Sequence, residues 1–258
     1  MAKKSTPPPT AASARQAKIQ AAQKSGGSGA NKIVVATVVA VVAIVAVVGG
    51  VVWSQSQKEA ATGSSTAVPA GASMGQGFPA FATATPVAGA PTVDLYEDFQ
   101  CPICAQFEAQ LGSTIQGLAA EGKVKLNYHV LNFLDDKTGA KNSTPAANGA
   151  FCAAADGKFQ EFHNAVFASQ VAEGKDVTDA DLGAWAATAG ITGDALTTWQ
   201  KCVADETYTK YVTSVNEAAF RIPSFQGTPT VMINGKVVEL NTISSPELLT
   251  QAIQNATQ

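Results

Sequence analysis

Short apolar stretches bounded by turn residues mark four strands in the C-terminal two thirds of the chain. They cover residues 92–96, 123–131, 230–233 and 236–240. The second stretch alternates apolar and polar residues, with Val124, Leu126, Tyr128 and Val130 on one face, as a half-buried strand does. Asn234-Gly235 separates the last two stretches and is the dipeptide most typical of a tight hairpin turn. The sequence therefore predicts that these two strands pair.

Longer segments carry apolar residues at helical spacing. The predicted helices cover residues 102–118, 145–155, 158–169, 179–189, 195–222 with a break near Ala204, and 246–256. In the fifth of these, Tyr208, Tyr211, Val212, Val215 and Ala219 fall on one face. The order is strand, helix, strand, a helical block at about 144–222, hairpin and helix. This order predicts an α/β fold that contains an all-helical insertion.

The N-terminal part of the chain differs in composition. Residues 1–32 carry six basic residues and no acid and are rich in Pro, Ala, Ser and Gly, so we expect a disordered tail. Residues 33–53 contain no charge and are long enough to span a bilayer, with the basic tail on the cytoplasmic side. A cleaved signal peptide is the alternative, although the small residues 70–72 lie far from the apolar run.

Composition also places the rest of the chain. Residues 54–91 are rich in Gly, Ser, Ala and Pro and predict a flexible tether, which leaves residues 92–258 as the folded domain. Beyond residue 53 the chain has 17 − 6 = 11 basic residues against all 20 acids, a net charge of −9. That charge argues against nucleic acid or an anionic membrane surface as a partner.

Two cysteines spaced C-x-x-C open the first helix of the domain. Cys101 lies where unpaired backbone N–H groups and the helix dipole favour a thiolate, and Pro102 suits the first helical turn. A thiol that ionises easily and has Cys104 as a resolving neighbour is the working part of a disulfide exchanger. The same motif can also be half of a zinc site, so the positions of the other cysteines are needed to choose between a disulfide exchanger and a zinc site.

The remaining cysteines, Cys152 and Cys202, lie near opposite ends of the helical block. They do not form a second close couple, which argues against a four-cysteine zinc site. If Cys101 pairs with Cys104, the other two are left to form a structural disulfide outside the cytoplasm. Two buried free thiols are the alternative.

Two stretches resemble the DsbA-like thiol–disulfide oxidoreductases, in particular the membrane-anchored type of actinobacteria. They are YEDFQCPIC, from Tyr96 to Cys104, and GTPTVMING, from Gly227 to Gly235. The resemblance implies a thioredoxin-like fold from about Thr92 onward and a cis peptide bond at Thr228-Pro229, facing the C-x-x-C disulfide. It also implies that Thr228 offers backbone hydrogen bonds to a substrate chain. Without the resemblance, Pro229 would be expected to start a strand in the trans form.

Four other polar residues are candidates for a chemical role. Glu97 and Asp98 precede Cys101 and could relay a proton to or from Cys104, but an ordinary solvated turn is the simpler expectation. Many thioredoxin-fold proteins carry a buried acid six residues before the first cysteine, where this chain has Leu95. His129 and His163 are the only histidines, and their apolar neighbours predict roles in packing.

The resemblance implies an enzyme, anchored in the membrane and facing outward, that donates its disulfide to unfolded exported proteins with free cysteines. A quinone-linked membrane protein of the DsbB or VKOR type would reoxidise it, and no cofactor or metal is expected. A reductase or isomerase, or a non-enzymatic binding module, are the alternatives. Because Ile103 supplies no charge, we expect a Cys101 pKa below that of a free cysteine but above the value of about 3.5 known for DsbA.

Overall fold

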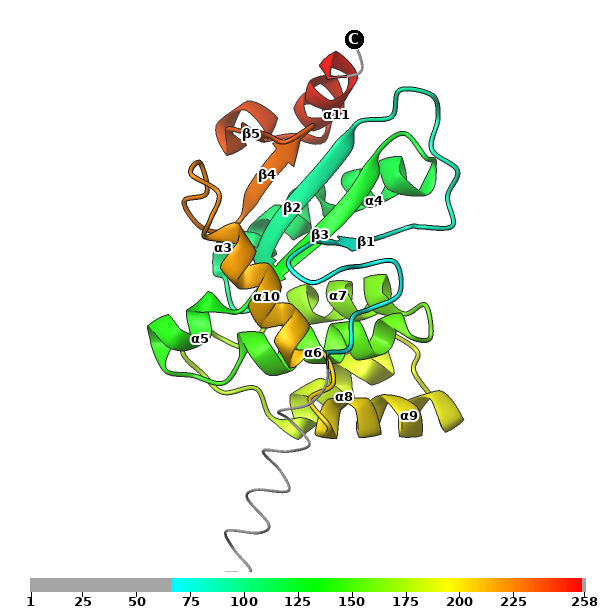
Figure 1. The fold of residues 1–258 in the computed structure, drawn as a ribbon, viewed down its shortest axis with the longest axis vertical. Coiled ribbons are helices and arrows are strands. Elements are labelled where there is room, and N and C mark those ends of the chain that lie inside the picture. The colour runs from blue at the N-terminus through cyan, green and yellow to red at the C-terminus, as the bar shows by residue number, and fades with distance from the viewer. Residues whose placement is uncertain (1–65, 257–258) are drawn as a thin grey trace, which may run out of the picture. The chain divides into compact units, whose positions relative to one another are not determined.

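One five-stranded sheet, in the order β1-β3-β2-β4-β5, organises the fold in a computed structural model that describes residues 66–256 (Figure 1). Its strands are β1 (Phe78–Pro79), β2 (Thr92–Asp98), β3 (Lys125–Leu131), β4 (Thr230–Ile233) and β5 (Lys236–Val238). β2 and β3 run parallel, and every other neighbouring pair is antiparallel. The hairpin predicted around Asn234-Gly235 is the β4–β5 pair, and Asn234 has the positive φ of 50° that such a turn requires.

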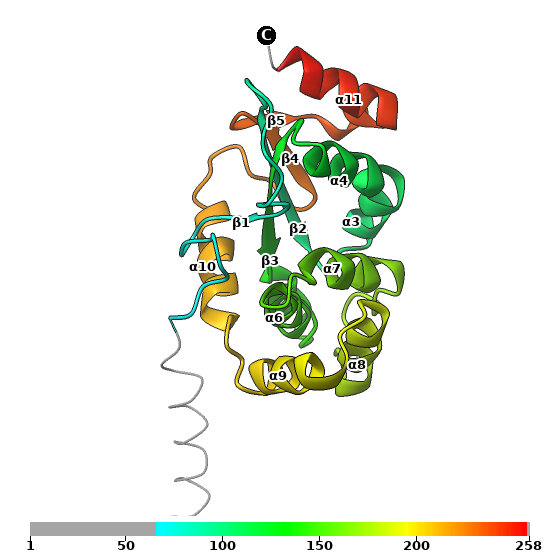
Figure 2. The ribbon, with the colours of Figure 1, turned by 90° about the vertical axis from the view of Figure 1, so that its right-hand side faces the viewer.

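Helices cover both faces of this sheet. They are α3 (Pro102–Phe107), α4 (Ser113–Ala120), α5 (Phe133–Thr138), α6 (Ser143–Ala154), α7 (Phe159–Ala168), α8 (Asp179–Thr188), α9 (Gly193–Ala204), α10 (Thr209–Ala219) and α11 (Pro246–Asn255), with a 3-10 turn at Leu240–Ile243. Helix α10 lies on one face, and α3, α4 and α11 lie on the other (Figure 2). The helical insertion runs from α5 to α10; the predicted block at about 144–222 corresponds to α6 to α10 and left out α5, and its break near Ala204 separates α9 from α10.

The first predicted helix, 102–118, is interrupted. A π-helical turn at Glu108–Gly112 separates α3 from α4, so one more residue per turn is accommodated there than an α-helix allows. π turns of this kind are frequent at functional sites, and this one directly follows α3, whose N-cap residue is Cys101.

Helix α6 is the centre of the helical insertion, and nine of its residues are buried. Its small side chains let aromatic neighbours approach closely, since a Cβ on Gly149 would come within 3.0 Å of the Phe162 ring. The Trp199 indole donates a hydrogen bond of 2.9 Å to the Gly149 carbonyl. The same apolar cluster continues into the sheet, so insertion and sheet share one core.

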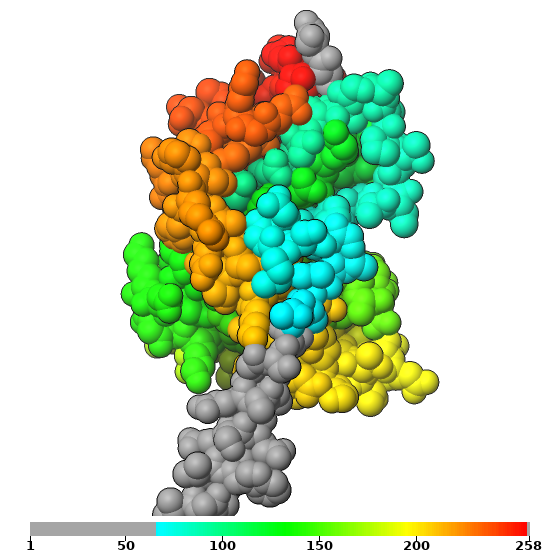
Figure 3. All heavy atoms as spheres, in the orientation of Figure 1, coloured from blue at the N-terminus to red at the C-terminus, as the bar shows by residue number. Residues whose placement is uncertain are grey.

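Residues 66–81, here called the N-terminal strap, correct the prediction of a tether that extends to residue 91. The strap pairs with β3 through β1 and lies on the surface beside α10 (Figure 3). Phe78 packs on Phe151 and Phe159, and the Tyr211 hydroxyl donates to the Gln76 carbonyl at 2.7 Å. Composition failed here because a few aromatic and backbone contacts hold an otherwise Gly- and Ala-rich segment in place.

None of the helices between residues 66 and 256 has both the length and the apolar character needed to cross a membrane. The predicted span at 33–53 and the predicted tail at 1–32 lie outside the described residues.

Candidate active site

The two C-x-x-C cysteines lie in different surroundings at the start of α3. Cys101 is the N-cap residue, Pro102 is the first helical residue, and the Cys101 N–H donates to the Asp98 carbonyl at 2.9 Å. Both are free thiols in the structure; Cys101 is 6% exposed, whereas Cys104 is completely buried. Ile103, between them, is 56% exposed. A reacting partner can therefore reach Cys101 and not Cys104.

Hydrogen bonds move the two thiol pKa values in opposite directions. A hydrogen bond from the Cys104 thiol, with help from local backbone N–H groups, lowers the pKa of Cys101 to about 6 in spite of its burial. The Thr228 hydroxyl adds to this effect and has no other partner among residues 66–256. Burial, the Cys101 hydrogen bond and the nearby Glu97 charge raise the pKa of Cys104 well above its usual range. Cys101 is thus the thiolate and Cys104 the protonated thiol at neutral pH.

The second motif faces the first. The peptide bond Thr228-Pro229 is cis, and the Cys101 sulfur lies 3.5 Å from the Thr228 carbonyl oxygen. Thr230, the first residue of β4, donates from its hydroxyl to the Gly227 carbonyl at 2.6 Å. The two segments that carry the sequence resemblance therefore meet at one site, although 127 positions separate Cys101 from Thr228.

The expectation that Glu97 and Asp98 form a solvated turn is wrong. Both belong to β2, and they are 1% and 0% exposed. Asp98 accepts hydrogen bonds from the Ser143 hydroxyl and from the backbone N–H groups of Gln100 and Leu134. Burial nevertheless raises its pKa to about 7. Its bonds tie the loop before Cys101 to the helical insertion, so Asp98 acts as an anchor of that loop.

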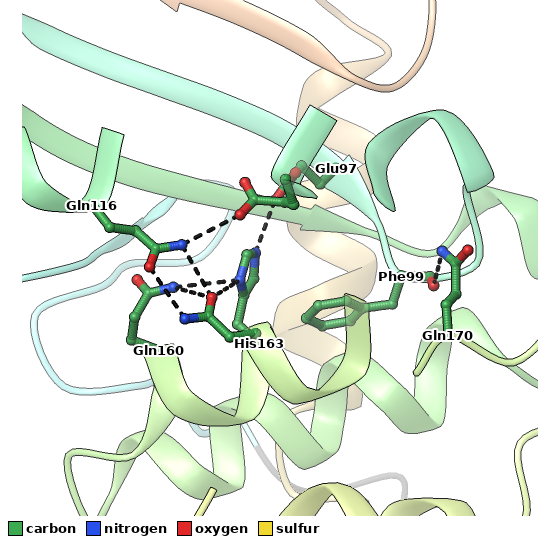
Figure 4. Close-up of polar contacts among 8 residues, drawn as sticks. Glu97, Phe99, Gln116, Gln160, His163 and Gln170 are labelled. Atoms are coloured by element: carbon green, nitrogen blue, oxygen red, sulfur yellow. Dashed lines mark hydrogen bonds and ion pairs between the residues drawn. The ribbon is translucent and has the colours of Figure 1, made fainter. Parts of the chain in front are cut away.

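Glu97 points instead into a buried polar cluster behind the cysteines (Figure 4). The His163 Nε2 lies 2.9 Å from a Glu97 carboxylate oxygen, and Glu97 and Glu108 are hydrogen-bonded to each other. Burial lowers the pKa of His163, so the neutral ring donates from Nε2 to Glu97. The packing role predicted for His163 is correct as far as burial goes, since Phe99, Phe159 and Phe167 surround it, but it leaves out this hydrogen bond.

One ligand atom from each of Glu97, Glu108 and His163 lies within 4.8 Å of the others, so the donor types suit a divalent cation. In the structure these atoms are engaged with one another, through the His163–Glu97 contact and the hydrogen bond between the two carboxyl groups. We therefore interpret the cluster as a hydrogen-bonded unit that holds protons and not as a cation site.

Two glutamines that sequence reasoning missed fix the loop before α3. Gln100 is completely buried and bonds to Ser143, Asp135 and Thr138 of the insertion. Gln170, shown in Figure 4, donates to the carbonyls of Phe99 and Cys101 at 2.7 and 2.9 Å. The sequence shows a Gln beside the C-x-x-C, but its burial and its hydrogen-bond partners depend on segments far along the chain.

The other candidates lie in the sheet and in the insertion. Cys152 in α6 and Cys202 in α9 form a disulfide across 50 positions. His129 on β3 contacts the Asp94 carboxylate at 3.0 Å and stacks on the Tyr96 ring.

Comparison with known proteins agrees with this geometry. A family model described as Thioredoxin matches residues 86–255. The chain belongs to the thioredoxin family. Among solved structures it is similar to oxidised DsbA of Mycobacterium tuberculosis, with 28% identity, a TM-score of 0.57, and coverage of 72% of this chain and 93% of that one. It is also similar to MdbA, a thiol-disulfide oxidoreductase from Actinomyces oris, with 26% identity, a TM-score of 0.55, and coverage of 66% and 82%.

A curated relative is the serine/threonine-protein kinase PknE of Mycobacterium tuberculosis, 35% identical over 107 residues. The match covers 38% of this chain and spans only 19% of the kinase's length. The resemblance of this thioredoxin-family protein to DsbA-like proteins is confirmed, and the matches support an oxidoreductase enzyme of the thiol–disulfide type.

Proposed function

We propose that this protein is a thiol–disulfide oxidase that donates a Cys101–Cys104 disulfide to exported proteins with free cysteines. The observation that carries the proposal is that the two thiols differ in accessibility and in pKa. Cys101 is reachable and its pKa is lowered to about 6, while Cys104 is sealed inside with a raised pKa. An exchanger needs one sulfur that meets the substrate and one that resolves within the protein.

The exchange begins with a substrate thiolate that attacks the Cys101 sulfur of the oxidised enzyme. The Cys101–Cys104 bond breaks, a mixed disulfide forms at Cys101, and Cys104 leaves as a thiolate. Glu97 is the buried acid whose charge raises the pKa of Cys104, and it supplies the proton that this thiolate takes up. A second substrate thiolate then attacks the substrate sulfur of the mixed disulfide, and Cys101 leaves as the thiolate that its surroundings stabilise.

The direction of electron flow follows from the reduction potential. Stabilising the Cys101 thiolate stabilises the reduced enzyme and makes its disulfide easier to donate. An equilibrium potential between about −120 and −180 mV against glutathione would support the oxidase. A value near about −270 mV would match thioredoxin and favour a reductase, while a C-x-x-C disulfide that glutathione cannot reduce would make it structural.

The proposal includes a place and a partner. The uncharged run 33–53 behind a basic tail supports a single-span anchor with the enzyme outside the cytoplasm. There, a quinone-linked membrane oxidase of the DsbB or VKOR type would restore the disulfide. Protease treatment of intact spheroplasts should degrade a C-terminally tagged chain from outside, and protection of the tag would contradict this orientation.

Oxidative refolding of a reduced secreted ribonuclease by the full-length protein tests the activity. We expect Cys101→Ser and Cys104→Ser each to abolish it, since neither variant can form the disulfide that is donated. Cys152→Ala/Cys202→Ala should retain it, since that disulfide lies in the insertion. A Cys101→Ser protein with full activity would leave only a binding role and refute the oxidase.

A further inference from the structure

The buried cluster behind the cysteines contains a second carboxyl group that the exchange described above does not use. Glu108 belongs to the π turn that follows α3, only seven positions after Cys101. It is hydrogen-bonded to Glu97, and one oxygen of each carboxyl group is buried without another partner among residues 66–256. Two carboxyl groups in contact in a buried setting are stable when they share a proton.

Glu108 also reaches the surface, which Glu97 does not. It lines a pocket of about 280 Å³ together with Gln116 and Asn164. The Gln116 amide donates to Glu108 at 3.3 Å and to Asn164 at 3.0 Å, and Asn164 donates back to Gln116 at 3.2 Å. This pair of amides holds the Glu108 carboxyl between the pocket and Glu97, which is 1% exposed.

The backbone is shaped to leave room for that position. Gly112, the last residue of the π turn, has no side chain, and a Cβ there would collide with the Glu108 carboxylate. By contrast, nothing lies within 4 Å of a Cβ placed on Gly117 in α4. Gly112 therefore permits the inward position of the Glu108 side chain.

The geometry points to Glu108 as the outer member of a two-carboxyl proton relay, which passes protons between Glu97 and water in the pocket lined by Gln116 and Asn164. This inference rests on the proposed disulfide exchange. When the enzyme is reoxidised, Glu97 accepts the Cys104 proton, the Cys104 thiolate attacks the Cys101 sulfur, and the partner leaves as a thiolate. The proton moves from Glu97 to Glu108 and then to water. Disulfide donation runs the same path in reverse.

The charges around Glu97 fit this role. Cys101 and Cys104 of α3, Glu108 of the π turn, His163 of α7 and the buried Tyr128 of β3 all face it. Burial and the Glu97 charge raise the pKa of Glu108 to about 8, and burial raises the pKa of Glu97 as well. The pair thus keeps a proton near neutral pH, where solvated carboxyl groups would have none.

Reaction of the reduced full-length protein with excess oxidised glutathione tests the relay, because it separates two steps. Cys101 first forms a mixed disulfide with glutathione, and Cys104 then closes the ring and releases glutathione. Acid quenching and mass spectrometry follow both species as a function of pH. General acid–base assistance typically accounts for a factor of about 10² or more, so Glu108→Gln should slow the second step at least about tenfold at neutral pH.

Glu108→Gln should also flatten the pH profile of the second step and leave the first step unchanged. Gly112→Ala, which displaces the Glu108 carboxyl without removing it, should slow the same step. Glu161→Gln on the surface of α7 and Gly117→Ala in α4 are the matched controls, and both should behave as wild type.

Each result decides a different claim. If Glu97→Gln slows the second step while Glu108→Gln and Gly112→Ala leave its rate and pH profile unchanged, Glu108 is not part of the relay. If Glu97→Gln also has no effect, there is no carboxyl relay at all. If the wild-type protein forms no mixed disulfide at Cys101, the proposed function itself fails, and this inference with it.

Discussion

The reactivity of Cys101 should depend on whether residue 104 can donate a hydrogen bond. The Cys104 thiol makes the largest contribution to the lowered pKa of Cys101. Cys104→Ala removes this donor, whereas Cys104→Ser keeps a hydroxyl donor in its place. A hydrogen bond to a charged partner is worth about 1.5–3 kcal/mol. At about 1.4 kcal/mol per pH unit, losing it should raise the Cys101 pKa by about one to two units.

In the alanine variant the pKa should therefore rise from about 6 to about 7–8, while the serine variant should stay near 6. At pH 7 the thiolate fraction would fall from about nine tenths to about half or less. The rate of alkylation by iodoacetamide, followed from acidic to alkaline pH, measures this directly. Cys101 is the only free thiol in either variant, because Cys152 and Cys202 are joined.

Coincident titration of the two variants would refute the reasoning. It would mean that the backbone N–H groups and Thr228 hold the thiolate without help from Cys104. An alanine variant that titrates below the serine variant would contradict it more strongly, because the donor at residue 104 would then raise the pKa of Cys101 where the structure has it lowering that pKa.

Three further predictions concern stability. Removing the disulfide with Cys152→Ala/Cys202→Ala should cost about 4 kcal/mol for a loop of 50 positions and lower the melting temperature by about 10 °C; a loss under about 1 kcal/mol in urea unfolding would contradict it. Gly77→Ala should destabilise the folded protein by about 1–3 kcal/mol, because the new Cβ would come within 2.6 Å of the buried His129 ring. Gly117→Ala, where nothing lies near the new Cβ in α4, should be neutral or should stabilise the protein by up to about 1 kcal/mol. Because the folded pKa of Cys101 is depressed, its contribution is complete above the unfolded pKa near 9 and is lost as pH falls through 6. The unfolding free energy of the reduced protein, measured relative to the oxidised one, should thus fall by about 1.4 kcal/mol between pH 7 and pH 5.

Local patterns predicted most elements of the fold. The alternation in 123–131, the Asn234-Gly235 turn and the break near Ala204 each rest on neighbouring residues. They correspond in the structure to β3, to the β4–β5 turn and to the break between α9 and α10. Helix α5 was missed because its six residues, Phe133–Thr138, are too few to show a helical period, and Gly139, with φ of 77°, ends it at once. The π turn was missed because no residue type specifies an extra residue within a helix.

The site was predicted only where it is encoded locally. The C-x-x-C spacing predicts the roles of Cys101 and Cys104, and the stretch around Pro229 predicts the role of that proline. The burial of Glu97 could not be read from its position before the helix, because it depends on α7 and the π turn closing over the end of β2. Glu108 and His163 lie 55 positions apart and become partners of Glu97 only after packing. Functional groups that act through a shared proton leave no periodic signal.

The N-terminal strap has a practical consequence for anyone who would express the catalytic part alone. A fragment that starts at Thr92, where composition first places the domain, would lack β1 and leave the outer edge of β3 unpaired. It would also uncover the aromatic surface on which Phe78 rests and strand the Tyr211 hydroxyl without its acceptor. Open strand edges and exposed aromatic rings promote self-association. Such a fragment would therefore tend to aggregate, and a fragment meant to stay soluble should begin at or before residue 66.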